Sequence, residues 1–361
     1  MKTTSVLFLF LAVVSLFALN GCSKAEKPEI IEMNILKSFE LKDIAGGNIA
    51  CSVGVYKNTI YYTRRTGDVF SIVFTDFDGN EIRHFDIPRG KGPGEAIMAM
   101  GVKVKDDIVY FYDLGLMRLS RFDLNGRFLD SIDYTPETGI ILFFAFLNDH
   151  LYIHSANNTY IGEIDPSTGR LLRSLPHPIQ GMPEVGTKLV GGMMETDPYT
   201  GEIYVGHACK PYRIERYDTD FNHLGTFTYG KDKEYEPVVY QDHLRIAGDT
   251  MVNSLAVDRD SIYAPHVGDR EYVDQENHAI RPEYPIEVYA FSKKSGKLAA
   301  IYKSKTLGVT QGTFGTVGTA DGKLVLIVSG FGHAVTALSG GIDDPKYRGY
   351  AVIIETNQES Q

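Results

Sequence analysis

Basic residues, cysteine and tryptophan are all scarce in this sequence. Its 361 residues include 36 Lys and Arg against 46 Asp and Glu, three cysteines and no tryptophan, and the formal net charge is −10. A chain this acidic has no basic stripe for phosphates, which excludes a nucleic-acid partner. No amphipathic helical period of useful length occurs beyond the first 21 residues. The sequence therefore predicts neither a helical domain nor a nucleic-acid-binding one.

Catalytic and metal-binding motifs are missing as well. There is no Gly-x-Ser-x-Gly elbow for a nucleophilic serine, and Ser339-Gly-Gly is typical of a flexible loop. No His-x-His pair occurs, and the acids between 269 and 283 lack the alternation of a calcium loop. Gly90–Glu95 is not a phosphate-binding loop, because no Lys-Ser/Thr follows it at the right spacing. We expect no metal and no cofactor.

The first 22 residues have the features of an export signal. Lys2 gives a positive start, Val6–Leu19 is almost wholly apolar, and the small residue Gly21 precedes Cys22. This order predicts a secretory signal peptide over residues 1–21, since the apolar run is shorter than the roughly 20 residues that span a bilayer. The segment Leu-Asn-Gly-Cys ending at Cys22 resembles a lipobox, the site where bacterial lipoproteins are cut and acylated. The resemblance implies that Cys22 becomes the lipid-bearing N-terminus.

Lipidation would place the protein in the cell envelope, with the lipid bilayer as its first partner. Ser23 stands where some inner-membrane lipoproteins carry Asp, which favours the outer membrane, facing either the periplasm or the exterior. Removal of residues 1–21 takes away one lysine and no acid, which changes the net charge from −10 to −11. Residues 22–29 would form a short tether. For Cys51 and Cys209 we expect two buried thiols rather than a disulfide.

Six repeats make up the rest of the chain. Each repeat begins with two apolar strands joined by a polar turn, and the second strands start 49, 42, 52, 59 and 62 residues apart. The abundance of glycine, tyrosine and phenylalanine fits strands joined by tight turns. The pairs are Asn48–Tyr56 with Thr59–Thr63, Ala99–Lys105 with Ile108–Asp113, Ile140–Leu147 with Leu151–Ser155, Leu189–Thr196 with Glu202–His207, Asn253–Asp258 with Ser261–His266, and Thr313–Thr319 with Lys323–Ser329.

The second half of each repeat ends in a hairpin. In its turn, glycine and Asn supply positive φ and Asp caps the turn. Self-similarity at this period, with four strands per unit, is the signature of propeller blades. We therefore predict an all-β fold, a six-bladed β-propeller of four-stranded antiparallel blades over residues 30–361. The hairpin turns are Asp76–Gly79, Asp123–Gly126, Asp165–Gly169, Asp218–Asn222 and Ser292–Gly296.

The last blade lacks a strand of its own. Tyr350–Glu355 supplies its third strand, and only a tail, 356–361, follows. The unmatched strand is Ile30–Leu41, near the other end of the chain. We predict that this N-terminal strand closes the last blade, because closure removes the open edge of the ring.

One loop between the first two blades carries a family resemblance. Its sequence, Asp-Ile-Pro-Arg-Gly-Lys-Gly-Pro-Gly-Glu over residues 86–95, resembles the Gly-x-Gly-Pro-Gly-Glu segment of six-bladed, TolB-like or NHL-like propeller lipoproteins of Bacteroidetes. The resemblance implies the fold and the envelope location but little chemistry. From the residues themselves we expect a rigid turn between blades in which Glu95 accepts hydrogen bonds from backbone amides.

The two faces of such a propeller differ. With strands A to D in each blade, the A–B and C–D turns share one face, here the turn face, and the B–C and D–A loops share the other, the loop face. The turns are short and regular, whereas blades 5 and 6 have long B–C loops, Val267–Pro285 and Gly330–Gly349. Function usually lies on variable loops. We expect the binding face to be the loop face, although loop drift without function is the alternative.

The end of strand B gives one equivalent position per blade, expected to ring the mouth of the central channel. Mixed His, Asp and Arg around a concave opening suits an anionic or sugar-like ligand. We expect Arg64, Asp113, His207, His266 and the nearby His333 to bind a ligand. Asp113 alternatively caps its own turn, and Arg118 and Arg213 alternatively donate to neighbouring loops. The six positions are Arg64, Asp113, Ser155, His207, His266 and Val328.

Two hypotheses for function follow. The first is a non-catalytic propeller that binds a glycan, a small molecule or an envelope protein, and the missing motifs favour it. The second is a glycan-directed lyase or hydrolase that uses His207 and His266 as catalytic residues. Propellers host many chemistries, so the fold alone does not decide.

Overall fold

A computed structural model describes most of the chain beyond residue 26. Cys22, Cys209, His333 and most of the two long loops lie outside the described residues. The described residues are 27–45, 49–134, 138–155, 159–176, 191–207, 212–229, 237–240, 243–246, 254–266, 271–272, 279–280, 284–309, 312–331 and 347–356.

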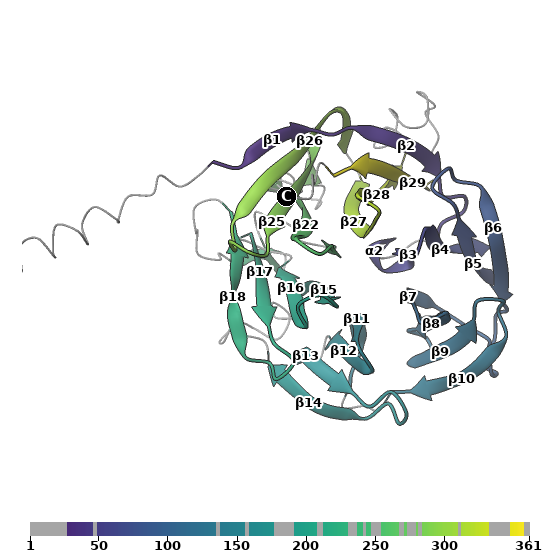
Figure 1. The fold of residues 1–361 in the computed structure, drawn as a ribbon. Coiled ribbons are helices and arrows are strands. Elements are labelled where there is room, and N and C mark those ends of the chain that lie inside the picture. The colour runs from purple at the N-terminus through teal and green to yellow at the C-terminus, as the bar shows by residue number, and fades with distance from the viewer. Residues whose placement is uncertain are drawn as a thin grey trace, which may run out of the picture.

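Six sheets stand around a central axis, which confirms the predicted six-bladed propeller (Figure 1). In blades 1 to 4 the chain runs from the innermost strand to the outermost, and all neighbouring strands are antiparallel. Blade 1 contains β3 (Val53–Tyr56), β4 (Thr59–Thr66), β5 (Val69–Thr75) and β6 (Glu81–Ile87). Blade 2 contains β7 (Ala99–Lys105), β8 (Ile108–Asp113), β9 (Arg118–Asp123) and β10 (Phe128–Asp133). Blade 3 contains β11 (Ile141–Leu147), β12 (His150–Ser155), β13 (Thr159–Ile164) and β14 (Leu171–Pro176), and blade 4 contains β15 (Gly191–Asp197), β16 (Glu202–His207), β17 (Arg213–Tyr217) and β18 (His223–Thr228).

The last two blades each take a strand from the N-terminal segment. Blade 5 contains β21 (Ala256–Val257), β22 (Ser261–His266), β25 (Tyr284–Ser292), β26 (Leu298–Val309) and, on its outer edge, β1 (Glu29–Glu32). Blade 6 contains β27 (Gly312–Ala320), β28 (Lys323–Phe331), β29 (Tyr347–Glu355) and, on its outer edge, β2 (Ile35–Glu40). Two small hairpins lie outside the blades: β19 (Pro237–Tyr240) with β20 (His243–Ile246), and β23 (Glu271–Tyr272) with β24 (Ala279–Ile280).

The N-terminal strand closes the ring as predicted, but it is two strands rather than one. β2 pairs antiparallel with β29 and completes blade 6, whereas β1 pairs in parallel with β26 and gives blade 5 a fifth strand. The break falls at Met33, whose backbone N–H donates to the carbonyl of Lys303 at 3.1 Å. The segment therefore spans two adjacent blades along the rim, as the purple ribbon in Figure 1 shows.

The start of the first blade also differs from its predicted strand, Asn48–Tyr56. Residues Ile49–Ser52 form a four-residue helix, α2, and only Val53–Tyr56 forms a strand. The helix places Cys51 at the centre of the ring, where its thiol is free and buried. This outcome confirms the expected buried thiol for Cys51.

The hairpin turns fold by the predicted chemistry. Asp76 Oδ1 accepts hydrogen bonds from the amides of Asp78 and Asn80, at 2.9 and 2.8 Å. Asp123 and Asp218 each accept two such bonds in blades 2 and 4. In blade 3, bonds from Ser167 lower the pKa of Asp165 to about 2. A carboxylate that accepts several local donors fixes the turn and with it the strand register.

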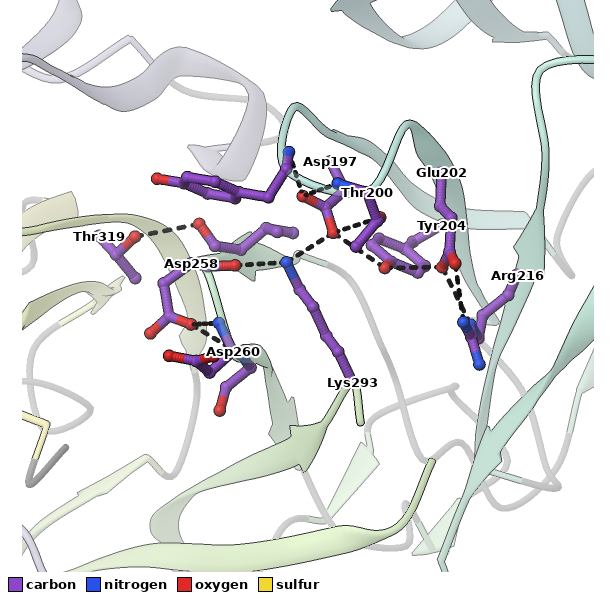
Figure 2. A network of polar contacts seen from close by, with 12 residues as sticks. Asp197, Thr200, Glu202, Tyr204, Arg216, Asp258, Asp260, Lys293 and Thr319 are labelled. Atoms are coloured by element: carbon purple, nitrogen blue, oxygen red, sulfur yellow. Dashed lines mark hydrogen bonds and ion pairs between the residues drawn. The ribbon is translucent and has the colours of Figure 1, made fainter. Parts of the chain in front are cut away.

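On the turn face, a network of polar contacts joins blades 4 and 5 (Figure 2). Lys293 Nζ lies 2.5 Å from Asp197 Oδ2 and also donates to the carbonyl of Asp258. Asp197 is fully buried and additionally accepts from the hydroxyls of Thr200 and Tyr204, at 2.7 and 3.1 Å. The carboxylate thus has the full set of donors that a buried charge requires.

No helix in the described part of the chain is long and apolar enough to cross a membrane. Apolar side chains fill the space between every pair of neighbouring blades. These apolar contacts hold the second strand of each blade in place, and the candidate site was predicted at the ends of these strands.

Candidate functional site

The predicted ring of strand-B ends divides among separate partners in separate blades. Arg64 forms an ion pair with Glu81 on the outer strand of its own blade, at 3.1 Å. Asp113 is buried and accepts backbone hydrogen bonds from Ile97, Met98 and Leu116, so it caps its own B–C turn and holds the preceding D–A loop. Ser155 and Val328 are buried. In the described contacts, Arg64 and Asp113 therefore serve their own blade.

The Gly90–Glu95 loop is held from within, as predicted. The carboxylate of Glu95 accepts the N–H of Gly92 at 2.7 Å. Arg118, at the start of β9, donates to the carbonyls of Gly92 and Glu95 at 2.9 and 2.8 Å. A side chain added at Gly90 would collide with the Glu95 carboxylate. The loop is a rigid inter-blade turn fastened by one arginine.

His207 is buried between blades 3 and 4. It is fully buried, Arg213 Nε donates to its Nδ1 at 3.2 Å, and its Nε2 lies 2.7 Å from the hydroxyl of Tyr160. Since Nδ1 accepts a hydrogen bond, the ring proton belongs on Nε2, and His207 is a neutral donor to Tyr160. The ring of Tyr160 in turn packs edge-on against Tyr217, with centroids 5.9 Å apart. Both ring nitrogens of His207 are thus committed to protein groups.

His266 occupies the equivalent position between blades 4 and 5, but its surroundings are more open. Its ring stacks on Tyr289 with centroids 4.6 Å apart and planes 11° apart. Tyr212, from blade 4, meets the His266 ring edge-on at 5.7 Å and donates its hydroxyl to the carbonyl of Pro265. The side chain of His266 remains 23% exposed, whereas His207 is fully buried. The structure thus distinguishes two histidines that the sequence pattern treats alike.

Two charged residues from adjacent strands complete this site. Glu287 Oε2 lies 3.2 Å from His266 Nδ1, and its Oε1 accepts from Lys303 Nζ at 2.6 Å. The hydrogen bond from His266, opposed by burial and supported by Lys303, lowers the pKa of Glu287 to about 2. Glu287 is therefore an anion throughout the physiological pH range. We call His266, Glu287, Lys303, Tyr289, Tyr212 and Tyr229 the His266 cluster.

Tyr229 provides the exposed aromatic surface of the cluster. It follows β18, is 41% exposed, and packs edge-on against Tyr289 at 5.1 Å. Sequence reasoning missed Glu287, Lys303 and the tyrosines, since they come from two further strands of blade 5 and from the neighbouring blade. Strand pairing brings these residues together: His266 on β22 lies opposite Glu287 on β25, which lies opposite Lys303 on β26. The sequence alone does not reveal this register.

The central channel opens on the opposite face. Innermost strands of blades 1 to 4 and 6 enclose a cavity of about 630 Å³ beside the A–B turns. Its charged walls are neutralised internally: Lys103 pairs with Glu195 at 2.5 Å, and Lys105 with Asp106 at 2.7 Å. Burial, which the Lys103 charge partly opposes, raises the pKa of the neighbouring Cys51 thiol to about 12. Charged groups pair with one another in both places, but the His266 cluster lies on the loop face and adds the exposed ring of Tyr229, which makes it the candidate site.

Metal-like geometry is lacking in the part of the chain that the structure describes: no three His, Cys, Asp or Glu side chains gather there. Each histidine whose side chain the structure describes instead contacts a carboxylate, a carbonyl or a hydroxyl of the protein. His154, for example, is buried within β12, contacts the carbonyl of Tyr160 at 2.8 Å, and has a pKa lowered by that burial.

The comparisons with known proteins concern the fold. No family model matches the chain, and no curated protein matches it. A DUF4221-family protein of Bacteroides vulgatus superposes with a TM-score of 0.57 at 11% identity, covering 91% of this chain and 100% of the other. A chain of the mitotic checkpoint complex gives 0.50 at 11%, covering 93% and 97%. A Bacteroides fragilis protein, provisionally named as exported, gives 0.48 at 10%, covering 90% and 95%.

The Bacteroides vulgatus protein shares the architecture of this chain, in agreement with the fold that the sequence resemblance implied. At these identities the likeness shows architecture only. Function has to be argued from the residues of this chain.

Proposed function

We propose that this protein is a non-catalytic binding propeller of the bacterial cell envelope, lipid-anchored at Cys22, which takes a ligand or partner on its loop face. The observation that carries the binding site is the His266 cluster at the loop end of blades 4 and 5. It combines a partly exposed imidazole, an ion pair and an exposed tyrosine ring.

A glycan is the ligand class that suits this cluster. Tyr229 offers a flat apolar surface for the C–H face of a sugar ring, while Glu287 and Lys303 offer an acceptor and donors for its hydroxyl groups. The aromatic rings beneath are stacked against each other and cost little entropy to hold in place. A site of this kind is prepared before the ligand arrives.

The enzyme hypothesis has one supporting observation. The His266–Glu287 contact resembles a base and its orienting carboxylate. Against it, His207 is buried with both nitrogens engaged, and Arg64 and Asp113 are bound within their own blades. A lyase or hydrolase would need His266 to act without these partners. We therefore favour binding, and the same assay separates the two.

The test uses the Cys22→Ala protein on an array of envelope polysaccharide fragments. We expect Tyr229→Ala and Glu287→Gln to weaken binding about tenfold or more. Tyr199→Ala, which removes an exposed tyrosine from the turn face, is the matched control and should bind normally. Retained binding in the Tyr229 and Glu287 variants would exclude this site. Cleavage products that disappear in His266→Ala would favour the enzyme.

The anchor is tested separately. Wild-type protein expressed with its leader should partition into the detergent phase, and Cys22→Ala should move to the aqueous phase because the acyl chains are lost. Mass spectrometry of the mature N-terminus identifies the acylated residue. An unmodified Cys22 would refute the anchor and leave the binding site untouched.

A further inference from the structure

Six exposed aliphatic side chains occupy equivalent places around the ring. Each is the second residue of the outermost strand of its blade, β1, β2, β6, β10, β14 or β18, and each is between 37% and 73% exposed. Single exposed apolar residues are common and need no explanation. An exposed aliphatic residue at the same position in every blade is a regular pattern rather than a set of isolated cases. The six, here the aliphatic rim, are Ile30, Leu36, Ile82, Leu129, Leu172 and Leu224.

All six lie near the turn face. In blades 1 to 4 the outermost strand begins directly after the C–D turn, so its second residue is close to that turn. In blade 6, Ile35 pairs with Ile354 near the end of β29, which places Leu36 at the same level. In blade 5, Glu29 pairs with Ala300 near the start of β26, which places Ile30 near the turn face as well.

The core does not require these side chains. Three residues further along the same strands, Phe39, Phe85, Ile132, Leu175 and Phe227 are buried or half-buried and supply the apolar contacts between blades. A polar residue in the rim would leave those contacts intact. The rim therefore calls for a partner outside the ring.

We propose that the aliphatic rim contacts the lipid surface to which Cys22 is anchored, so that the turn face lies against the membrane and the loop face points away. The proposal rests on the lipid anchor proposed above. Its independent support is where the chain joins the ring: Glu29 lies at the turn-face edge of blade 5. The seven-residue step from Cys22 to Glu29 reaches at most about 25 Å. That length holds the turn face close to the bilayer.

The net charge of the protein indicates which kind of lipid bilayer the rim would contact. A net charge near −11 opposes an anionic leaflet, so the contact would be made by apolar side chains at the headgroup boundary of a zwitterionic bilayer. The orientation leaves the His266 cluster accessible, because the cluster sits on the other face.

The absence of tryptophan allows a direct test, since one introduced tryptophan is the sole reporter of its position. Two pairs compare the faces within one blade. Leu129→Trp on the rim is matched by Met98→Trp on the loop face of blade 2, and Leu172→Trp by Ile140→Trp in blade 3. Met98 and Ile140 are 50% and 42% exposed, so all four sites are open to solvent. Circular dichroism checks folding, and Ile82→Trp replaces a rim variant that fails to fold.

Lipidated protein is reconstituted in phosphatidylcholine vesicles that carry brominated acyl chains. We expect bromine to quench the rim tryptophans at least about twofold more strongly than their loop-face partners, since only the rim reaches the acyl boundary. Equal quenching within the pairs, or stronger quenching on the loop face, overturns the inference. Flotation of the wild type beside Cys22→Ala separates the causes. A wild type that does not float overturns the anchor and this inference together, whereas flotation with equal quenching overturns this inference alone.

Discussion

At the scale of single residues, the ion pair of Lys293 and Asp197 links two blades through a site from which water is excluded. Lys293 is 7% exposed and Asp197 is fully buried. Burial alone would raise the pKa of Asp197, but the hydrogen bonds from Lys293 and Thr200 bring it below its usual value. The fold can therefore tolerate the buried Asp197 carboxylate only while these hydrogen-bond and ion-pair partners are present.

Replacement of Lys293 tests this dependence. Lys293→Met leaves the Asp197 carboxylate buried without its cation, and we expect a loss of about 3 to 5 kcal/mol in the free energy of unfolding. Urea denaturation followed by circular dichroism measures it. Lys37→Met is the matched control, because Lys37 pairs with Asp78 at an exposed site and its loss should cost less than about 1 kcal/mol. Similar losses in both variants would contradict the argument.

Glu287 gives a pH-dependent prediction. Its pKa falls from an ordinary value of 4.5 to about 2 in the folded protein. A lowered carboxyl pKa means that the folded state favours the anion, so the added stability is present above pH 4.5 and is lost as the pH falls towards 2. Glu287→Gln should cost about 1.5 kcal/mol at pH 7. The difference from wild type in thermal midpoint should shrink between pH 4.5 and 2, and a constant difference would contradict it.

At the scale of elements, the N-terminal segment has two separable roles. β2 covers the edge of β29, and Leu41 directly after it is buried in the core between blades 6 and 1. β1 only adds a fifth strand to the outside of blade 5. The two strands should therefore contribute unequally to folding.

Two truncations compare them. Removal of residues up to Glu32 deletes β1 but keeps the buried Met33, and we expect a folded protein with a modestly lower thermal midpoint. Removal of residues up to Glu40 also deletes β2 and exposes the edge of β29, which should cause aggregation or loss of cooperative unfolding. Size-exclusion chromatography and calorimetry of both proteins distinguish these outcomes. A stable, monomeric protein without β2 would show that closure is dispensable.

Sequence reasoning succeeded where local chemistry decides the structure. Aspartate-capped turns such as Asp76–Gly79 set the ends of the strands from within five residues, and β7, β8, β16 and β22 have their predicted bounds. It failed where a distant partner decides. Nothing near Met33 indicates that β1 would join blade 5 in parallel, and an apolar run does not identify α2 as a helix turn.

The candidate site shows the same limit. The repeat pattern placed His207 and His266 at equivalent positions, and both do lie at the end of a second strand between blades. The two histidines differ in burial because different side chains surround them. His207 contacts Arg213 and Tyr160, whereas His266 contacts Glu287 and remains partly exposed. The contacts of His207 with Tyr160 and of His266 with Glu287 join residues 47 and 21 positions apart, which local sequence does not reveal.

At the scale of the whole molecule, the ring is held together by overlapping apolar layers. One core cluster runs through blades 3, 4 and 5, and others bridge blades 5 and 6, 6 and 1, 1 and 2, and 2 and 3. No blade therefore has a core of its own. Open arrays of repeats can unfold piece by piece, but a closed ring in which each layer is shared should not.

We accordingly expect the propeller to unfold as one unit. Single tryptophans at Leu129 in blade 2 and Leu224 in blade 4 report two blades that do not touch each other, and their urea midpoints should coincide with that of circular dichroism. Lys293→Met, added to each reporter, acts at the interface of blades 4 and 5. If the ring is cooperative, it lowers both midpoints equally, including the one in blade 2 that it does not touch. If it lowers only the blade 4 midpoint, the blades are independent, and the closing strand β2 joins the ends of the ring without coupling its parts.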